Sequence, residues 1–299
     1  MPILHAIVLG LVQGLSEFLP ISSSAHLEVV PWLLGWDDFA ARPDLETTFD
    51  VALHVGTFVG AVAYFRHDVV RLARGGVNAL RARRVATEVA VSEVSVPPAR
   101  GASTGPEEPD DGRLAWLLIA SSVPAALVGG LFEEVFAGIG ETKWLVGVLL
   151  AGFGLVLLWA DRLGGDRGAE DFSMRDALTM GVAQALALQP GVSRSGVTIT
   201  AARRLGFRRE AAARLSFLMS LPVIAGAALY KGLDLLVAGG IPAGFGGAFA
   251  WGVATSAITG WAAVWGTLRL VRTRTFTPFV IYRALAGAAI VAVAITGWR

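Results

Sequence analysis

Two polar stretches that contain proline carry the side chains best suited to chemistry in this otherwise apolar chain. In each stretch a glycine is followed three residues later by glutamine, and then by a leucine, a proline and a cluster of serines. Their polar side chains are Gln13, Glu17, Ser22, Ser23, Ser24 and His26 in the first, and Gln184, Gln189, Ser193, Arg194, Ser195 and Thr198 in the second. Inside a membrane an ionised side chain costs roughly 2.5–3.5 kcal/mol at the bilayer centre, so such residues usually mark a site. Two matching stretches predict a single site where two repeats meet.

The chemistry expected at this site is anion binding and nucleophilic attack. Gln13 and Glu17 are four residues apart, so they share a helix face. Pro20 and Pro190 interrupt a helix, and the N–H groups and dipole at the start of the next helix favour an anion. Arg194 adds a planar guanidinium that matches phosphate oxygens. A serine with a neighbouring base can act as a nucleophile, so these residues favour phosphoryl transfer or hydrolysis of a phosphate ester.

The residue types leave several roles open. Ser22, Ser23 and Ser24 are adjacent, so spacing does not decide which hydroxyl faces the ligand. The base is either His26, whose neutral ring suits catalysis near pH 7, or Glu17. Direct attack by water would use the same residues as attack by a serine.

The composition indicates a membrane protein. Of the 299 residues, 54% are hydrophobic and only 16% are charged, and the mean hydropathy is +0.60, which is far more apolar than a soluble domain. The chain has no cysteine, which excludes disulfides and thiol catalysis. The N-terminus lacks a basic region and a cleavage site, so we expect no removable signal peptide. Neither the net charge of +1 nor the arginine-rich loops give grounds to expect a nucleic-acid partner.

Six segments have the roughly 20 apolar residues that a spanning helix needs. They are residues 48–65, 114–132, 144–160, 212–230, 248–268 and 278–298. Residues 3–34 and 174–205 are also apolar but contain the polar stretches, and each would break into halves too short to span. Broken backbone at membrane depth is tolerated only when it is buried in protein or lines a wet cavity. We therefore expect an all-α polytopic membrane protein with six transmembrane helices and two re-entrant helix–loop–helix hairpins.

Charge placement predicts the topology. Arginines concentrate after the first span, after the second hairpin and before the last span, and acidic residues dominate the opposite side. The positive-inside rule then places the arginine-rich loops in the cytoplasm and both termini outside. Each hairpin precedes three spans, so the halves, about 1–162 and 174–299, form an inverted repeat within one integral membrane domain, 1–299. Residues 85–112, rich in proline and acidic residues, are expected to form a flexible cytoplasmic loop.

Other polar and small residues are expected to have structural roles. Asp50 and His54 are four residues apart in the first span; a structural hydrogen bond is the favoured interpretation, and lining of the cavity is the alternative. Arg283 is expected to extend from the last span to the cytoplasmic interface. Gly147 and Ala151 should let two helices pack closely. The arginine-rich loops are suited to anionic lipid headgroups.

The two polar stretches resemble the signatures of a known family. Residues 13–26 (QGLSEFLPISSSAH) and 190–198 (PGVSRSGVT) are similar to the two signatures of undecaprenyl pyrophosphate phosphatases of the bacitracin-resistance type. The resemblance continues through residues 48–56, 216–222 and 278–283, and it covers nearly the whole chain except 85–112. Both signatures occur in order at matching places, which is strongly specific.

The resemblance implies an integral membrane hydrolase of the plasma membrane, with a site that opens to the outer face. It would convert a polyprenyl (undecaprenyl-type) pyrophosphate to the monophosphate and inorganic phosphate, and so recycle the lipid carrier for cell-envelope glycan synthesis. The implied catalytic residues are Ser23, His26, Glu17 and Arg194, and the implied substrate-binding residues are Gln13, Ser22, Ser193, Ser195 and Thr198. A divalent cation, Mg²⁺ or Ca²⁺, is also implied, with Glu17 as a ligand.

Three residues depart from the family pattern. Gln13 stands where members have Glu or Gln, which weakens the case for a metal held by two carboxylates. Ala25 replaces the usual glycine, and His54 stands where glutamine is common.

The alternative function is a transporter or flippase of a phosphorylated isoprenoid lipid. Many secondary transporters bind substrate at broken helices within inverted repeats. A transporter needs anion-binding groups but no nucleophile beside a base, so Ser23, His26 and Glu17 favour an enzyme. The sequence leaves open the length and saturation of the isoprenoid, and whether the protein is a monomer or a homodimer.

Overall fold

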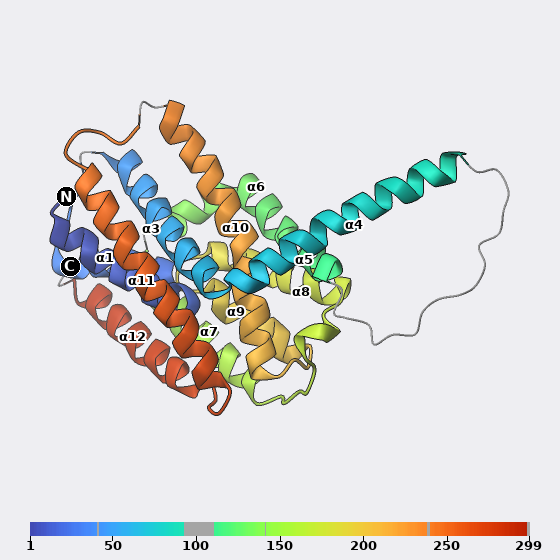
Figure 1. Ribbon diagram of the computed structural model, residues 1–299. Coiled ribbons are helices and arrows are strands. Elements are labelled where there is room, and N and C mark those ends of the chain that lie inside the picture. The colour runs from blue at the N-terminus through green and yellow to red at the C-terminus, as the bar shows by residue number, and fades with distance from the viewer. Residues whose placement is uncertain (41, 93–110, 141, 238–239, 298–299) are drawn as a thin grey trace.

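The protein is helical throughout the residues that the structure describes. The computed structural model describes residues 1–40, 42–92, 111–140, 142–237 and 240–297, and these ranges contain helices and no β-strand (Figure 1). A single β-bridge joins Arg167 to Phe207. The prediction of an all-α protein is confirmed.

The first half of the chain contains seven helices. They are α1 (Ile3–Phe18), α2 (Ser23–Leu34), α3 (Pro43–Tyr64), α4 (Arg66–Ser92), α5 (Asp111–Ala120), α6 (Val123–Gly140) and α7 (Lys143–Asp161). α2 ends at Gly35, which takes the left-handed φ of 66° that favours glycine at a helix C-terminus. The axis of α4 turns by 87° from that of α3, so α4 leaves the bundle sideways (Figure 1).

The second half follows the same order of a broken pair and then long helices. Its elements are η1 (Ala169–Asp171), α8 (Met174–Ala185), η2 (Leu186–Leu188), α9 (Arg194–Arg204), α10 (Arg209–Val237), α11 (Gly246–Val271) and α12 (Thr277–Thr296). α8 begins with a capping box, in which the Ser173 side chain accepts from Asp176 N and the Asp176 carboxylate accepts from Ser173 N. The beginning of α1 and the end of α12 lie at the same end of the bundle (Figure 1).

The apolar helices show a multi-pass membrane protein. Within the described ranges, four helical stretches are long and apolar enough to span, namely 111–131, 143–161, 209–235 and 277–296, and the bent α3–α4 pair can add a fifth. Each of the six predicted spans coincides with a helix or, for 114–132, with the consecutive helices α5 and α6. α11 is not among the four because its glycine, serine and threonine residues lower its hydropathy.

Both segments expected to form hairpins are broken near their middle. α1 and α2 are separated by residues 19–22, and α8 and η2 are separated from α9 by residues 189–193. The residue before each second helix is a serine with a positive φ angle, 74° at Ser22 and 75° at Ser193. In the described part of the chain no other non-glycine residue has a positive φ, a conformation that such residues rarely adopt. The geometry of the two breaks matches, and the division into half-repeats stays a prediction.

Glycines allow the long helices to approach closely. A Cβ atom at Gly14 of α1 would lie 2.7 Å from the Ser256 carbonyl of α11. α7 and α12 cross where a Cβ atom at Gly147 would lie 2.8 Å from the Gly287 carbonyl, and a Cβ at Gly287 would lie 3.0 Å from the Ala151 side chain. The prediction that Gly147 and Ala151 serve helix packing is confirmed.

The loop expected at residues 85–112 is shorter than predicted. α4 continues to Ser92 and α5 begins at Asp111, so helix occupies both ends of the segment. The remaining residues, 93–110, lie outside the described part of the chain, and their predicted flexibility stays a prediction.

A buried carboxylate, Asp161, joins four helix ends. Its Oδ1 accepts a hydrogen bond from Arg209 Nε at 2.6 Å and lies 3.5 Å from Arg203 Nε, and its Oδ2 accepts from Phe276 N at 3.1 Å. These partners belong to the end of α9 and to the beginnings of α10 and α12. Arg203 and Asp161 are both only 3% exposed, so this buried cluster holds the four helix ends together.

Candidate active site

The two breaks face one cavity of about 260 Å³. Its polar lining consists of Glu17, Ser22, Ser23, Ser24, His54, Ser193 and Arg194. Its apolar lining consists of Val51, Ala187, Val223, Ile224, Ala227 and Ala228, mostly from α10. We call this space the Glu17 cavity. A polar wall opposite an apolar one suits a ligand with an anionic head and a hydrocarbon chain.

Glu17 is the centre of the polar wall. Its Oε1 accepts a hydrogen bond from Arg194 Nη2 at 2.9 Å, and its Oε2 accepts from Ser23 Oγ at 2.5 Å. Gln13 Nε2 also donates to Oε2, at 3.0 Å. The carboxylate is only 4% exposed, so these charge-assisted bonds form away from bulk water. The structure therefore brings together Glu17, Ser23 and Arg194 from α1, α2 and α9, as the sequence predicted.

Ser23 and Arg194 occupy equivalent places in the two breaks. Each is the first residue of its helix and follows the serine with positive φ. The hydroxyls on either side also pair alike, since Ser22 and Ser24 Oγ lie 3.3 Å apart, and Ser193 and Ser195 Oγ lie 3.3 Å apart. The starts of α2 and α9 therefore bring N–H groups without intrahelical partners, and two positive dipole ends, to one cavity. Such ends bind anions.

Direct bonds join the two breaks. Gly191 N donates to Ser22 Oγ at 3.2 Å, and Ser195 Oγ donates to the Leu19 carbonyl at 3.0 Å. Gly191 has a φ of 94°, and a Cβ atom there would lie 2.6 Å from the Val146 carbonyl, so both its conformation and its surroundings require glycine. The breaks thus form one connected unit.

Arg283 of α12 holds both breaks, a role that the sequence analysis missed. Its Nη1 donates to the Pro20 carbonyl at 3.0 Å, and its Nη2 donates to the Gly191 and Val192 carbonyls, each at 3.0 Å. Its Nε donates to the Leu150 carbonyl of α7 at 2.8 Å, and the residue is fully buried. The prediction that Arg283 extends to the interface is wrong, because these carbonyls hold it in the interior. The available signal was an arginine six residues inside an apolar span, which marks a site by default.

His26 is not part of the Glu17 cavity. Its Nδ1 lies 2.7 Å from the Ser22 carbonyl, and its Nε2 lies 2.6 Å from the Tyr282 hydroxyl. Because a carbonyl only accepts, Nδ1 carries a proton, and Nε2 of the neutral ring accepts from Tyr282. These bonds turn the ring toward α12, where it lines a separate, mostly apolar cavity of about 220 Å³ with Val29 and Ile290. The structure therefore does not place His26 beside Ser23 and Glu17, as its expected role as base required.

His54 does line the Glu17 cavity. The hydrogen bond expected between Asp50 and His54 is present, since His54 Nδ1 donates to Asp50 at 2.8 Å. The acceptor is the backbone carbonyl of Asp50 and not its carboxylate. His54 Nε2 lies 3.5 Å from Glu17 Oε2. The ring thus adds a fourth polar neighbour to the Glu17 carboxylate.

The predicted substrate-binding residues divide into two groups. Ser22 and Ser193 line the cavity, whereas Gln13, Ser195 and Thr198 are buried behind it. Thr198 Oγ1 donates to the Arg194 carbonyl at 2.8 Å and lies 2.6 Å from Ser216 Oγ on α10. The geometry of the buried group suits support of the residues that line the cavity.

Five buried polar atoms of the two polar stretches lack partners among the described residues. They are Gln13 Oε1, Gln184 Nε2 and Oε1, Gln189 Nε2 and, beside the cavity, Arg194 Nη1. Buried polar atoms are nearly always hydrogen-bonded, so an orphaned guanidinium N–H beside the cavity suits an anionic ligand oxygen.

The described lining does not by itself form a cage for a divalent cation. Among the described residues, Glu17 is the only carboxylate that lines the cavity, and both of its oxygens already accept hydrogen bonds. Within the described ranges, no three His, Asp or Glu side chains are grouped so that they could hold a metal. Mg²⁺ and Ca²⁺ take about six or more oxygen ligands, so most ligands of a cation beside Glu17 would come from water or from the substrate.

Comparison with known proteins shows the family of this chain. The family model for the bacitracin resistance protein BacA matches residues 6–289. The chain is 48% identical over 299 residues to an undecaprenyl-diphosphatase of Pelobacter propionicus, with 99% of each chain covered. It is 46% identical to an undecaprenyl-diphosphatase of Geobacter sulfurreducens, with 98% of each covered. A third, from Nocardioides sp., is 42% identical, with 98% of this chain and 97% of the relative covered. The chain therefore belongs to the BacA family of bacitracin resistance proteins.

Proposed function

We propose that this protein hydrolyses undecaprenyl diphosphate to undecaprenyl phosphate and inorganic phosphate. The names of the similar proteins state this activity, and the polar and apolar walls of the Glu17 cavity suit a lipid diphosphate. The observation that carries the proposal is the contact of Ser23 and Arg194, from two different broken segments, with the same carboxylate of Glu17. Hydrolysis of the carrier diphosphate would recycle the lipid for cell-envelope glycan synthesis.

The terminal phosphate binds between the starts of α2 and α9. The free Nη1 of Arg194 and the first-turn N–H groups hold its oxygens, with the hydroxyls of Ser22 and Ser193 beside them. The isoprenoid chain lies along the apolar α10 wall that includes Val223 and Ala227. Dedicated donors at the site of developing charge stabilise the transition state of phosphoryl transfer.

Ser23 is the nucleophile in this scheme, and Glu17 is its base. Ser23 Oγ attacks the terminal phosphorus while its proton passes to Glu17 Oε2, 2.5 Å away. The bond from that phosphorus to the bridging oxygen breaks, and undecaprenyl phosphate leaves with the proton from Glu17. Water then attacks the phosphoserine, and Glu17 accepts a proton of the water. The bond from phosphorus to Ser23 Oγ breaks, phosphate leaves, and Glu17 returns the proton to Ser23 Oγ. His26 has a positioning role here, because it holds the Ser22 carbonyl.

A divalent cation, where one takes part, arrives with the substrate. Mg²⁺ is commonly bound through one or two carboxylates together with substrate phosphates. Glu17 is the one carboxylate on the cavity wall, and it is the candidate ligand for a cation bound to the diphosphate. No step above depends on this cation.

The protein lies in the plasma membrane with six spans and two re-entrant hairpins, and the Glu17 cavity opens to the outer face. The arginine-rich loops mark the cytoplasmic side. In that orientation α3 begins at the outer face and α10 ends at the outer face. The cavity is lined by Val51, early in α3, and by residues from Val223 to Ala228, in the later half of α10. These positions support access from the outer leaflet. A homodimer remains compatible with this arrangement.

The test is phosphate release from undecaprenyl diphosphate by purified full-length protein in detergent, with and without Mg²⁺ or Ca²⁺. Ser23→Ala and Arg194→Ala should each lower turnover by about 100-fold or more, as removal of a transition-state donor does. Ser220→Ala is the matched control, because its hydroxyl is buried and bonded to the Phe217 carbonyl away from the cavity. Near-normal turnover by folded Ser23→Ala would refute the serine mechanism. No release by folded wild-type protein would favour lipid transport instead.

A further inference from the structure

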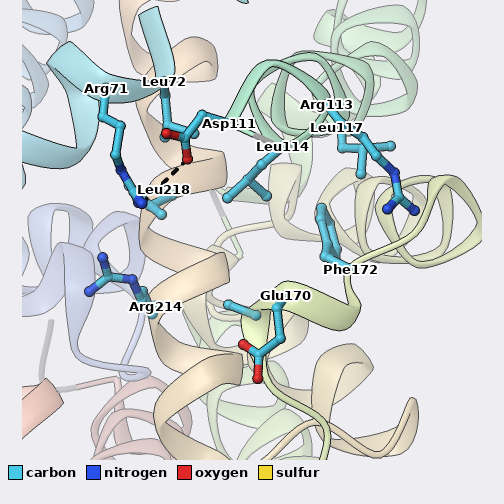
Figure 2. A pocket seen from close by; sticks show the side chains of 11 residues that line it. Arg71, Leu72, Asp111, Arg113, Leu114, Leu117, Glu170, Phe172, Arg214 and Leu218 are labelled. Carbon is cyan, nitrogen blue, oxygen red and sulfur yellow. Dashed lines mark ion pairs between the residues drawn. The ribbon is translucent and has the colours of Figure 1, made fainter. Parts of the chain in front are cut away.

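A second cavity lies where α4 leaves the bundle, and it shares no lining residue with the Glu17 cavity. Its volume is about 220 Å³, and α4, α5, η1 and α10 contribute to its walls. Figure 2 shows Arg71 and Arg214 on one side of it and Arg113 on the other, with Leu114 and Phe172 between them. We call it the arginine cavity. It combines three arginines and the carboxylates of Asp111 and Glu170 with an apolar floor.

The orientation of α4 places this cavity at a membrane surface. α3 belongs to the membrane-spanning part of the chain, and α4 turns from it by 87°, so α4 runs along the surface. α4 exposes Val70, Val77 and Leu80 close to Arg74 and Arg81. Apolar side chains next to arginines are typical of helices that lie in the interface between headgroups and acyl chains. A ligand of the arginine cavity is therefore at the depth of lipid headgroups.

Arg71 and Arg214 face the carboxylates of Asp68 and Asp111, and Arg214 keeps donors that no described residue accepts. Arg214 Nη2 donates to Asp68 Oδ1 at 2.7 Å, and Arg71 Nη2 donates to the same oxygen at 3.2 Å. Arg71 Nη1 lies 3.3 Å from Asp111 Oδ1. Two guanidinium groups thus share one carboxylate oxygen, and Arg214 Nε and Nη1 make no hydrogen bond to a described residue. These donors are available to a further anion.

We propose that the arginine cavity binds the phosphate group of an anionic phospholipid from the leaflet on which α4 lies. The guanidinium forks match phosphate oxygens, and the apolar floor of Leu72, Leu114 and Phe172 receives the glycerol and the first part of the acyl chains. A free phosphate ion would gain nothing from the apolar floor. The proposal rests on the membrane orientation and is independent of the hydrolytic function, since the two cavities are separate.

The experiment is native mass spectrometry of the delipidated full-length protein in a neutral detergent. Phosphatidylglycerol and phosphatidylcholine of the same chain length are titrated in turn, and inorganic phosphate is the competitor. Wild-type protein should bind phosphatidylglycerol about 10-fold more tightly than phosphatidylcholine, and Arg71→Gln with Arg214→Gln should remove most of this preference. Arg204→Gln with Arg272→Gln is the control with the same change of charge, and it should keep the preference.

A second measurement distinguishes a loss of lipid binding from a loss of the folded structure. Phosphate release from undecaprenyl diphosphate by the same preparations reports whether each variant is folded, since neither arginine lines the Glu17 cavity. If the double variant does not fold, Arg214→Gln alone is used, which removes one bond to Asp68 and should lower the preference about threefold or more. An unchanged lipid preference in a folded variant would overturn the proposal. Displacement of the lipid by equimolar inorganic phosphate would overturn it in favour of a free-phosphate site.

Discussion

Replacement of Arg283 by lysine should slow turnover far more than it weakens substrate binding. The guanidinium of Arg283 donates four hydrogen bonds, to carbonyls of Pro20, Gly191, Val192 and Leu150. Three of these carbonyls belong to the breaks that carry Ser23 and Arg194, whereas none of Arg283's atoms lines the Glu17 cavity. Arg283 is therefore a positioning residue, and its loss should misplace the reacting groups.

The size of the effect follows from the donor geometry. A lysine ammonium is a single centre, so it cannot reach carbonyls on opposite sides of the guanidinium fork, and about two of the four bonds should be lost. Hydrogen bonds from charged groups are worth about 1.5–3 kcal/mol each, so the loss is about 3 kcal/mol or more. A misplacement of about 1 Å can lower turnover by about 100-fold. We expect kcat to fall by about 10- to 100-fold and KM to change by less than about threefold.

The assay is steady-state phosphate release from undecaprenyl diphosphate, with the thermal unfolding midpoint measured on the same preparations. Arg272→Lys is the control, because Arg272 is an exposed arginine paired with Glu210. Arg283→Met is less informative, since it would leave buried carbonyls without donors and would disturb the fold itself. Wild-type kcat in a folded Arg283→Lys protein would refute the reasoning that this side chain sets the geometry of the breaks.

Four further predictions test the remaining contacts. Glu17→Gln should lower kcat by about 100- to 10,000-fold, as loss of a general base does, and turnover within threefold of wild type would exclude Glu17 as the base. The variant should also lower the unfolding midpoint, because Arg194 loses its buried carboxylate partner, so kcat is measured on protein shown to be folded. His26→Ala and Tyr282→Phe should lower kcat by similar factors, because the two side chains act through one shared hydrogen bond. A much larger loss of kcat in His26→Ala would identify His26 as the base. Asp161→Asn should destabilise the protein by about 3–5 kcal/mol in denaturant unfolding, because it leaves buried arginine charge unpaired, and an unchanged midpoint would contradict this account. Gln184→Leu should leave the free energy of unfolding unchanged or increased, since both polar atoms of this buried amide lack partners in the described structure. A decrease in that free energy of more than about 1 kcal/mol would show that the amide makes a stabilising contact.

The local features of the site were predictable because they depend on neighbouring residues. A proline followed by serines breaks an apolar helix wherever it occurs, and both breaks appear at the expected positions. The similarity of the two stretches then predicted that they meet, and the contacts of Ser23 and Arg194 with Glu17 agree with it. The all-helical class followed from hydropathy alone.

Contacts between distant parts of the chain were not predictable in the same way. Arg283 donates hydrogen bonds to carbonyls that lie 91 to 263 residues away. Every residue has a main-chain carbonyl, so the sequence does not show which of them accept these bonds. The direction of the His26 ring depends on Tyr282, which is 256 residues away. Residues 85–92 are too few to predict a span, yet they continue α4, because a helix that lies along a surface needs no apolar span.

The two polar stretches supply unlike residues to the one Glu17 cavity that they share. When Gln13 is matched with Gln184, the position of Glu17 is matched with Leu188, so only the first half provides a carboxylate. Gln13 Nε2 donates to Glu17, whereas both polar atoms of the Gln184 amide lack partners among the described residues. The helix after the first break begins with Ser23, which provides a hydroxyl. The helix after the second break begins with Arg194, which provides a guanidinium. A nucleophile beside a base needs the first half and the binding of phosphate needs the second, so neither half can carry out the proposed reaction alone.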